Sequence, residues 1–231
     1  MSPSMPHFLD RYDAGRRLGA ALRDHANDRP LIVLGLPSGG MPVATRVAEA
    51  LDAPLDAFVV RTLRVPGRPD LAMGAIASGG TEVLNRDVIE AARISQRVID
   101  EVIAAERLQL EQEEWILDGG RRLPVLAGET VIVVDDGADT GTTMRLAVNT
   151  LRQLGPRAII AAIPVASRAA IALLDATADE CVALIAPDPF HSVGAWYGDF
   201  SETTAAEVRV LLAEAQRRYA CTSDTSLSAV M

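Results

Sequence analysis

The sequence predicts an α/β fold, a doubly wound and mainly parallel five-stranded sheet flanked by helices. Short stretches rich in Val, Ile and Leu alternate with amphipathic stretches of helical period, which is the order that such a sheet requires. Residues 131–134 are four consecutive β-branched aliphatics, typical of a strand buried on both faces. With 231 residues, 49% of them hydrophobic, the chain can form one domain over residues 1–218.

The first part of the chain has the pattern of a helix followed by a βαβ unit. We expect a helix over 10–26, a strand over 31–34, a helix over 42–51 and a strand over 55–60. Pro42 falls in the first turn of the second helix, where its missing N–H has no consequence. The two strands would then be parallel and joined by a right-handed crossover.

The segment 61–80 combines three arginines with Gly, Pro and small residues. We expect this segment to be a loop that acts as a mobile lid over an anionic ligand, since Arg binds phosphate-like groups well.

Residues 75–84 have the pattern of a hairpin that turns at Gly79-Gly80. Asn85 would then cap a single long helix that runs to about Leu117, inside a helical insertion over 85–120. One apolar stripe along this helix favours a role in packing or in a dimer contact.

The second half continues the alternation of strands and helices. We expect a strand over 131–134, a helix over 142–154, a strand over 158–164, a helix over 167–174, a strand over 181–185 and a final helix up to residue 218. Residues 219–231 are polar and rich in Ser and Thr, and we expect this tail to be disordered.

Composition excludes several function classes. The net charge is −9, from 31 acidic and 22 basic residues, which argues against binding of the nucleic-acid backbone. No apolar run approaches the roughly 18 residues that a membrane span needs. Every basic residue is Arg, so no phosphate-binding motif that ends in Gly-Lys is present. The two cysteines have no metal or redox spacing, and we expect a cytoplasmic protein.

The most informative stretch is 131–145, in which a predicted strand ends in Asp135 and Asp136 and a loop of small residues then enters a helix. Ligands bind at the carboxyl ends of the strands in open parallel sheets. The loop would direct backbone N–H groups and the positive end of the helix dipole at one point, which suits a phosphate. The two carboxylates would repel that phosphate, so sugar hydroxyls or Mg²⁺ are their natural partners.

This stretch resembles the PRPP-binding motif of the type I phosphoribosyltransferases. The resemblance implies that Asp135 and Asp136 hold the ribose hydroxyls of PRPP and, through them, Mg²⁺. It implies that Asp139 handles the proton on the acceptor base. The residues that it assigns to the 5′-phosphate are Gly137, Ala138, Asp139, Thr140, Gly141, Thr142 and Thr143. The match is sharp over 131–147, softer over 34–44 and 61–76, and follows the order of elements over 8–218.

A second loop, Pro37-Ser38-Gly39-Gly40, also ends a strand and opens a helix, so it is another candidate cradle for an anion. By the same resemblance, this loop and Arg61 would bind the pyrophosphate of PRPP, and Arg61 would take part in catalysis. Related chains usually have Arg where Ser38 stands and Lys where Thr62 stands. This departure leaves open a protein that binds PRPP for regulation, or a catalytically idle relative.

A distant alternative is a serine hydrolase with Ser38 as the nucleophile, because residues 36–40 approach the motif G-x-S-x-G. His191 would be the base of such an enzyme. Leu36 stands in place of the first glycine, however, and the tight turn of that motif needs a small residue there.

Four of the nine aromatic residues lie in one loop within 187–202, which we expect to form a hood. Phe190, His191 and Trp196 are candidates for contact with a flat acceptor base. The alternative is a hydrophobic clamp that seals the end of the sheet or a dimer seam.

The resemblance implies a pentosyltransferase of nucleotide metabolism. It would move the 5-phosphoribosyl group of PRPP to a purine-like or pyrimidine-like base and release pyrophosphate, with Mg²⁺ as cofactor. The expected partners are PRPP and a small-molecule base, without nucleic acid or membrane, and a homodimer is possible. The sequence leaves the identity of the base open.

Overall fold

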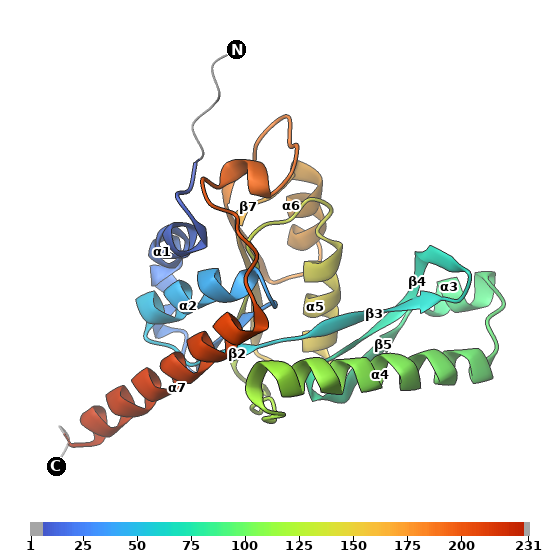
Figure 1. Ribbon diagram of the computed structural model, residues 1–231, viewed down its shortest axis with the longest axis horizontal. Coiled ribbons are helices and arrows are strands. Elements are labelled where there is room, and N and C mark those ends of the chain that lie inside the picture. The colour runs from blue at the N-terminus through green and yellow to red at the C-terminus, as the bar shows by residue number, and fades with distance from the viewer. Residues whose placement is uncertain (1–6, 229–231) are drawn as a thin grey trace.

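The computed structural model describes residues 7–228, and side chains up to residue 220. Its centre is a five-stranded sheet in the order β2-β1-β6-β7-β8, in which every neighbouring pair is parallel (Figure 1). The strands are β1 (Leu31–Gly35), β2 (Leu55–Ala57), β6 (Thr130–Val134), β7 (Ala158–Val165) and β8 (Glu180–Ile185). This architecture confirms the predicted fold class.

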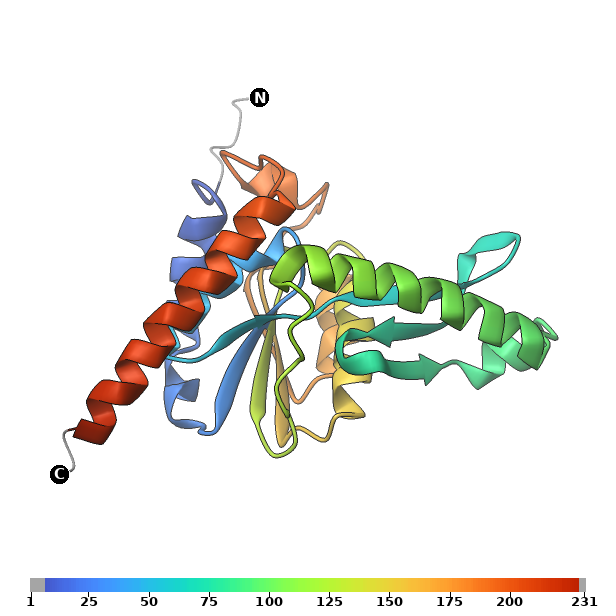
Figure 2. The same cartoon turned by 60° about the horizontal axis from the view of Figure 1, so that its bottom comes forward.

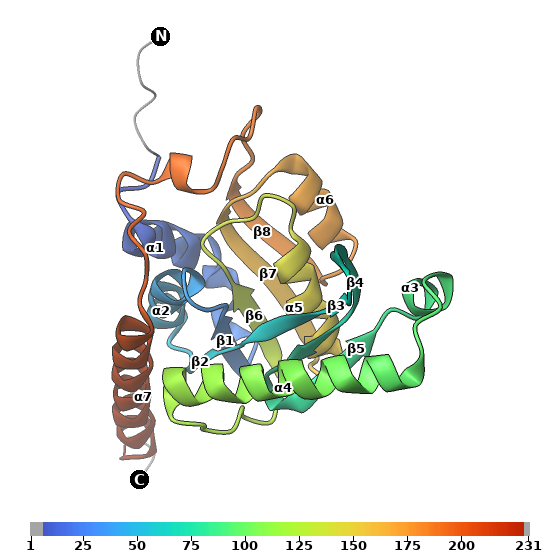
Figure 3. The same cartoon turned by 45° about the vertical axis from the view of Figure 1, so that its right-hand side comes forward.

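Helices cover both faces of the sheet, as a doubly wound fold requires. One face carries α1 (Arg11–Ala21) and α2 (Gly40–Leu51), and the other carries α5 (Thr142–Arg152) and α6 (Arg168–Asp175) (Figure 3). Successive residues of β6 alternate between the two cores: Ile132 packs on the α2 side and Val133 on the α5 side. The helix expected over 10–26 is α1 followed by a short 3₁₀ turn, Arg23–Asn27.

Residues 60–118 form an arm that projects from the core (Figures 1 and 2). Its antiparallel sheet contains β3 (Val60–Val65), β4 (Arg68–Ala77) and β5 (Thr81–Leu84). The prediction of a lid loop over 61–80 is therefore wrong, because most of this segment forms β3 and β4. Leu63, Val65 and Met73 are buried, so the alternation of a half-buried strand is present, although the Arg, Gly and Pro content of the segment hides it. The hairpin turn at Gly79-Gly80 is confirmed, with Ala77 opposite Thr81.

The prediction of a single helix after Asn85 is also wrong, because the chain forms two helices there. The Asn85 side chain accepts a hydrogen bond from Val88 N–H and caps α3 (Arg86–Ala91), and α4 then runs over Gln96–Asp118. Arg93 lies between them with a left-handed φ of 53° that no helix continues through. The break lets Ile94 N–H bond back to the Ile89 carbonyl at 3.0 Å. Both side chains then pack against the core cluster.

The last helix, α7 (Ala205–Ser228), packs along α2 and α4 through Val208, Leu211 and Leu212. It continues into the tail for which the composition predicts disorder. A helix that is already formed and packed adds residues easily, which explains the difference. Residues 229–231 of that tail lie outside the described residues.

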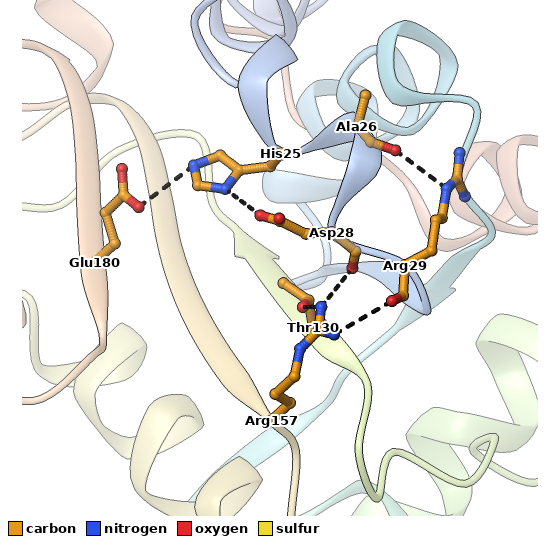
Figure 4. A network of polar contacts seen from close by, with 7 residues as sticks. All are labelled: His25, Ala26, Asp28, Arg29, Thr130, Arg157 and Glu180. Atoms are coloured by element: carbon orange, nitrogen blue, oxygen red, sulfur yellow. Dashed lines mark hydrogen bonds and ion pairs between the residues drawn. The ribbon is translucent and has the colours of Figure 1, made fainter.

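The amino ends of the strands are tied together by a polar network (Figure 4). The Arg157 guanidinium donates to the carbonyls of Arg29 (3.2 Å) and Asp28 (2.8 Å) and to Thr130 Oγ1. His25 lies between two carboxylates, with Nδ1 at 2.8 Å from Asp28 and Nε2 at 3.3 Å from Glu180. These contacts join the starts of β1, β6, β7 and β8, and the opposite end of the sheet carries the site.

Candidate active site

The two loops singled out in the sequence meet at the carboxyl ends of β1 and β6. Gly35 is paired with Val134 in the sheet, so the segments that follow both strands begin side by side. A Cβ added at Gly39 would collide with Asp136 Oδ2, and one at Gly40 would lie 2.7 Å from the Val134 carbonyl oxygen. Only glycines allow this approach, so the loop 37–40 and the acidic pair form one site.

The acidic pair is largely buried, and each carboxylate uses one oxygen within the protein. Asp135 Oδ1 accepts from Asp136 N–H at 2.9 Å, and Asp136 Oδ2 accepts from Arg11 Nε at 2.8 Å. Their second oxygens make no hydrogen bond with another described residue. Two acceptors therefore remain for a ligand.

Burial and mutual repulsion change the acidity of this pair. Burial raises the pKa of Asp135 well above its usual range, and the charge of Asp136 raises it further. Burial also raises the pKa of Asp136, and the hydrogen bond and charge of Arg11 offset that rise only in part. Carboxyl groups whose pKa is raised by burial and by a neighbouring charge are typical of ligand-binding and catalytic sites.

The loop 137–143 is anchored to the end of β7 and the segment that follows it, and its other side is exposed to solvent. Ala138 N–H donates to the Val165 carbonyl at 2.9 Å, and the Ser167 hydroxyl donates to the Asp139 carbonyl. Gly141 has a φ of +71° and packs directly on Ala170. The N–H groups of residues 139–141 and 143 find no partner among the described residues. The side chains at the top of the loop are exposed, namely Asp139, Thr140, Thr142 and Thr143.

These features form a cradle suited to a phosphate. The loop leads into the amino end of α5, where the helix dipole is positive. The hydroxyls of Thr140 and Thr142 lie 3.0 Å apart and can add donors beside the N–H groups that lack a partner among the described residues.

The loop 37–40 offers a smaller second cradle at the start of α2. Ser38 is exposed, and the N–H groups of Ser38 and Gly39 have no partner among the residues that the structure describes. The Gly40 N–H is used within the loop, by the Leu36 carbonyl at 3.0 Å. His191 is also exposed, and no hydrogen bond joins it to Ser38 in the described part of the chain, so the geometry of a hydrolase triad is not formed.

Arg61, which the resemblance assigns to the pyrophosphate, is engaged elsewhere in this structure. Its Nε lies 2.7 Å from Glu106 and its Nη1 lies 3.2 Å from Glu113, both on α4. The guanidinium therefore joins β3 to α4 within the arm.

Three side chains of the site, those of Arg11, Tyr197 and Phe200, lie outside the motif at residues 131–147. Arg11 comes from the first turn of α1, and besides Asp136 it binds the Ser201 carbonyl at 2.6 Å. Its guanidinium lies 3.9 Å from the centre of the Phe200 ring. The Tyr197 hydroxyl donates to the Asp136 carbonyl at 2.5 Å. Arg11 and Asp136 lie 125 residues apart, and no local pattern predicts such a contact.

The aromatic loop packs over the site. Tyr197 forms a bridge with the fully buried Phe8, and Phe190 and Trp196 contact the same apolar cluster together with Val165. This packing is what a hydrophobic clamp predicts for these aromatic side chains. His191 is exposed at the tip, and contact of Phe190, His191 or Trp196 with a base stays a prediction.

Comparison with known proteins identifies the family. The family model of the phosphoribosyl transferase domain matches residues 8–196. The chain belongs to the phosphoribosyl transferase family. This match confirms the resemblance found at residues 131–147. The enzymes of this family are pentosyltransferases, a type of glycosyltransferase.

This phosphoribosyl transferase domain is similar in sequence to curated proteins and similar in fold to a solved structure. A Mycobacterium tuberculosis protein, "Putative phosphoribosyl transferase Rv0571c", is 38% identical over 216 residues, which is 94% of this chain and 48% of the relative. The chain thus spans about half the length of the curated relatives it matches. The crystal structure of TT1426 from Thermus thermophilus has 37% identity and a TM-score of 0.80, and the match covers 90% of this chain and 98% of that one.

None of the helices in residues 7–228 has the length and apolar character needed to cross a bilayer. Within the same residues, no group of three or more His, Cys, Asp or Glu side chains could hold a metal ion.

Proposed function

We propose that this phosphoribosyl transferase domain moves the 5-phosphoribosyl group of PRPP to a nitrogenous base and releases pyrophosphate. The observation that carries this proposal is the meeting, at one end of the sheet, of the acidic pair with two sets of N–H groups that have no partner among the described residues. PRPP has a phosphate at one end, two hydroxyls in the middle and a pyrophosphate at the other, and the site offers a partner for each.

The loops would divide the ligand between them. The cradle at 137–143 would bind the 5′-phosphate, and the loop 37–40 would bind the pyrophosphate. The second oxygens of Asp135 and Asp136 would accept hydrogen bonds from the ribose hydroxyls. This division keeps the carboxylates away from both phosphate groups, which they would repel.

The chemistry needs positioning and charge balance more than a covalent intermediate. The bond from C1 of the ribose to the pyrophosphate breaks while a ring nitrogen approaches, so positive charge develops on the sugar. Asp135 and Asp136, once ionised, would stabilise that charge. The exposed carboxylate of Asp139, at the edge of the cradle, would accept the proton of the base or return it.

The residues present fit Mg²⁺ held through the ligand. The described chain forms no closed metal cage, but Mg²⁺ commonly binds through one or two carboxylates together with substrate phosphates. Asp135 and Asp136 would hold it through the ribose hydroxyls that their second oxygens bind. Bound there, the ion would neutralise charge on the departing pyrophosphate.

Calorimetric titration of PRPP, with and without Mg²⁺, tests the site directly. We expect binding that is strengthened by Mg²⁺ and weakened, but still measurable, in Asp136→Asn. Asp139→Asn should bind PRPP like the wild type but release little pyrophosphate with any base from a panel of purines and pyrimidines. Absence of PRPP binding both with and without Mg²⁺ would refute the proposal. Equal loss of binding and turnover in Asp139→Asn would remove the proton-transfer role.

A regulatory or catalytically idle PRPP-binding protein is the second candidate. It is favoured by Ser38, which brings no charge to the pyrophosphate loop, and by the ion pairs that engage Arg61 on α4. Such a protein would bind PRPP with the same dependence on Asp136 and release no pyrophosphate with any base. Pyrophosphate release therefore separates the two candidates.

A further inference from the structure

Arg11 occupies a central place beside the acidic pair. Its side chain is 11% exposed, and its partner Asp136 is 14% exposed. If a Cβ were present on Gly39, it would lie 3.4 Å from Arg11 Nε, so this guanidinium also borders the loop 37–40. The other charged candidate, Arg61, is held in the arm by Glu106 and Glu113.

The guanidinium is fixed by contacts of three different kinds. Nε donates to Asp136, Nη1 donates to the Ser201 carbonyl, and the flat face lies on Phe200. These contacts define both the position and the plane of the group, which a flexible Lys ammonium could not reproduce. Arg11 thereby connects α1, the acidic pair and the segment 197–201.

The contact with Asp136 leaves a defined acceptor free. Arg11 takes Oδ2, which also faces Gly39, and Tyr197 holds the backbone carbonyl of the same residue. With Oδ2 and the main chain both held, the orientation of Oδ1 is fixed. That is the oxygen without a hydrogen bond to another described residue.

We propose that Arg11 is a positioning residue of the PRPP site, which holds Asp136 so that Oδ1 faces the ribose hydroxyls. This inference rests on the proposed function. It assigns to the first helix a part in ligand binding that the motif at 131–147 does not contain. A group preorganised in this way binds without first having to be ordered, which strengthens binding.

A double-mutant cycle tests whether Arg11 acts through Asp136. PRPP affinity in the presence of Mg²⁺ would be measured by calorimetry for the wild type, Arg11→Gln, Asp136→Asn and the double variant. We expect Arg11→Gln to weaken binding roughly tenfold or more in the wild-type background and by less than about twofold in the Asp136→Asn background. Arg11→Lys should fall between the wild type and Arg11→Gln, because Lys keeps the charge but loses the fork.

Arg16→Gln is the matched control, since Arg16 lies on the same helix, has a side chain that is 58% exposed, and pairs with Asp13 at 3.1 Å. It should leave PRPP affinity unchanged. If Arg11→Gln costs the same affinity in both backgrounds, or costs none, the role of Arg11 is overturned while the proposed function stands. If the wild type itself does not bind PRPP, the proposed function falls and this inference falls with it.

Discussion

The two ends of the parallel sheet are built in opposite ways. At the amino end, Arg157, Arg29 and His25 bind carbonyls and carboxylates from neighbouring segments, and the polar groups are paired with one another (Figure 4). At the carboxyl end, two loops keep N–H groups without partners among the described residues, and the acidic pair keeps two free oxygens. One end of the same sheet therefore holds the fold together, and the other end is left available to a ligand.

Two aspartates make the contrast concrete. At the amino end, burial acts to raise the pKa of Asp179, but hydrogen bonds from Arg152 and from Ile159 N–H outweigh it and lower the pKa below its usual value. At the carboxyl end, burial dominates and raises the pKa of Asp135. Folding therefore favours the ionised form of Asp179 and disfavours the ionised form of Asp135, each relative to the unfolded chain. Groups that reduce stability in this way are characteristic of functional sites.

The largest effect should come from filling the contact between the two loops. Gly39→Ala places a methyl group against Asp136 Oδ2, so the loop 37–40 has to move off the acidic pair. We expect PRPP binding to fall roughly a hundredfold, with a loss of about 1–3 kcal/mol in stability, measured by calorimetry and urea unfolding. Ser38→Ala adds no bulk in the same loop, so we expect a much smaller loss of affinity than in Gly39→Ala. Unchanged affinity in Gly39→Ala would show that the two loops do not act as one site.

At the opposite end, a substitution should affect stability alone. Arg157→Gln loses the bonds to Arg29, Asp28 and Thr130, and we expect a loss of about 1–2 kcal/mol in the free energy of unfolding. Arg23→Gln, an exposed residue of the nearby 3₁₀ turn, should change stability little. PRPP affinity should be unchanged in both variants. A large loss of affinity in Arg157→Gln would contradict the division of roles between the two ends.

Removing a charge from the site should stabilise the ligand-free protein. The pKa of Asp135 is higher in the folded than in the unfolded state, so the ionised form destabilises the fold as the pH rises through that interval. We expect Asp135→Asn to raise the free energy of unfolding at pH 7.5 by about 1 kcal/mol. The gain should shrink in acid, where the wild-type carboxyl is protonated in both states. Urea unfolding at several pH values measures this gain. A loss of stability in Asp135→Asn at pH 7.5 would contradict the conclusion that ionised Asp135 destabilises the fold.

The smallest effect should be the reverse one at Asp179. Its folded pKa lies below the unfolded value, so it contributes stability above the unfolded pKa and loses that contribution as the pH falls through the folded one. Asp179→Asn should lower stability at neutral pH by less than about 0.5 kcal/mol, because the ion pair with Arg152 is largely exposed. The same unfolding series measures it, and a stabilised variant at neutral pH would remove the contrast with Asp135.

The sequence predicted those parts of the protein that depend on local patterns. The strands of the parallel sheet and the loops at 37–40 and 137–143 carry their signals within a few consecutive residues. The arm was missed because the alternation around Leu63 and Val65 lies among residues typical of loops. The partners of Arg61 and Arg11 were missed because both ion pairs join residues distant in the chain, and only the folded arrangement selects among many acids of equal local character.

The contacts of Asp136 also set an order of events during synthesis. Its carboxylate is held by residue 11 and its carbonyl by residue 197, so one partner emerges from the ribosome long before the acidic pair and the other long after it. A nascent chain that ends before Tyr197 can form the central strands, but Asp136 lacks that second anchor and Phe8 lacks its bridge. The site is therefore completed late in translation, after the sheet that carries it.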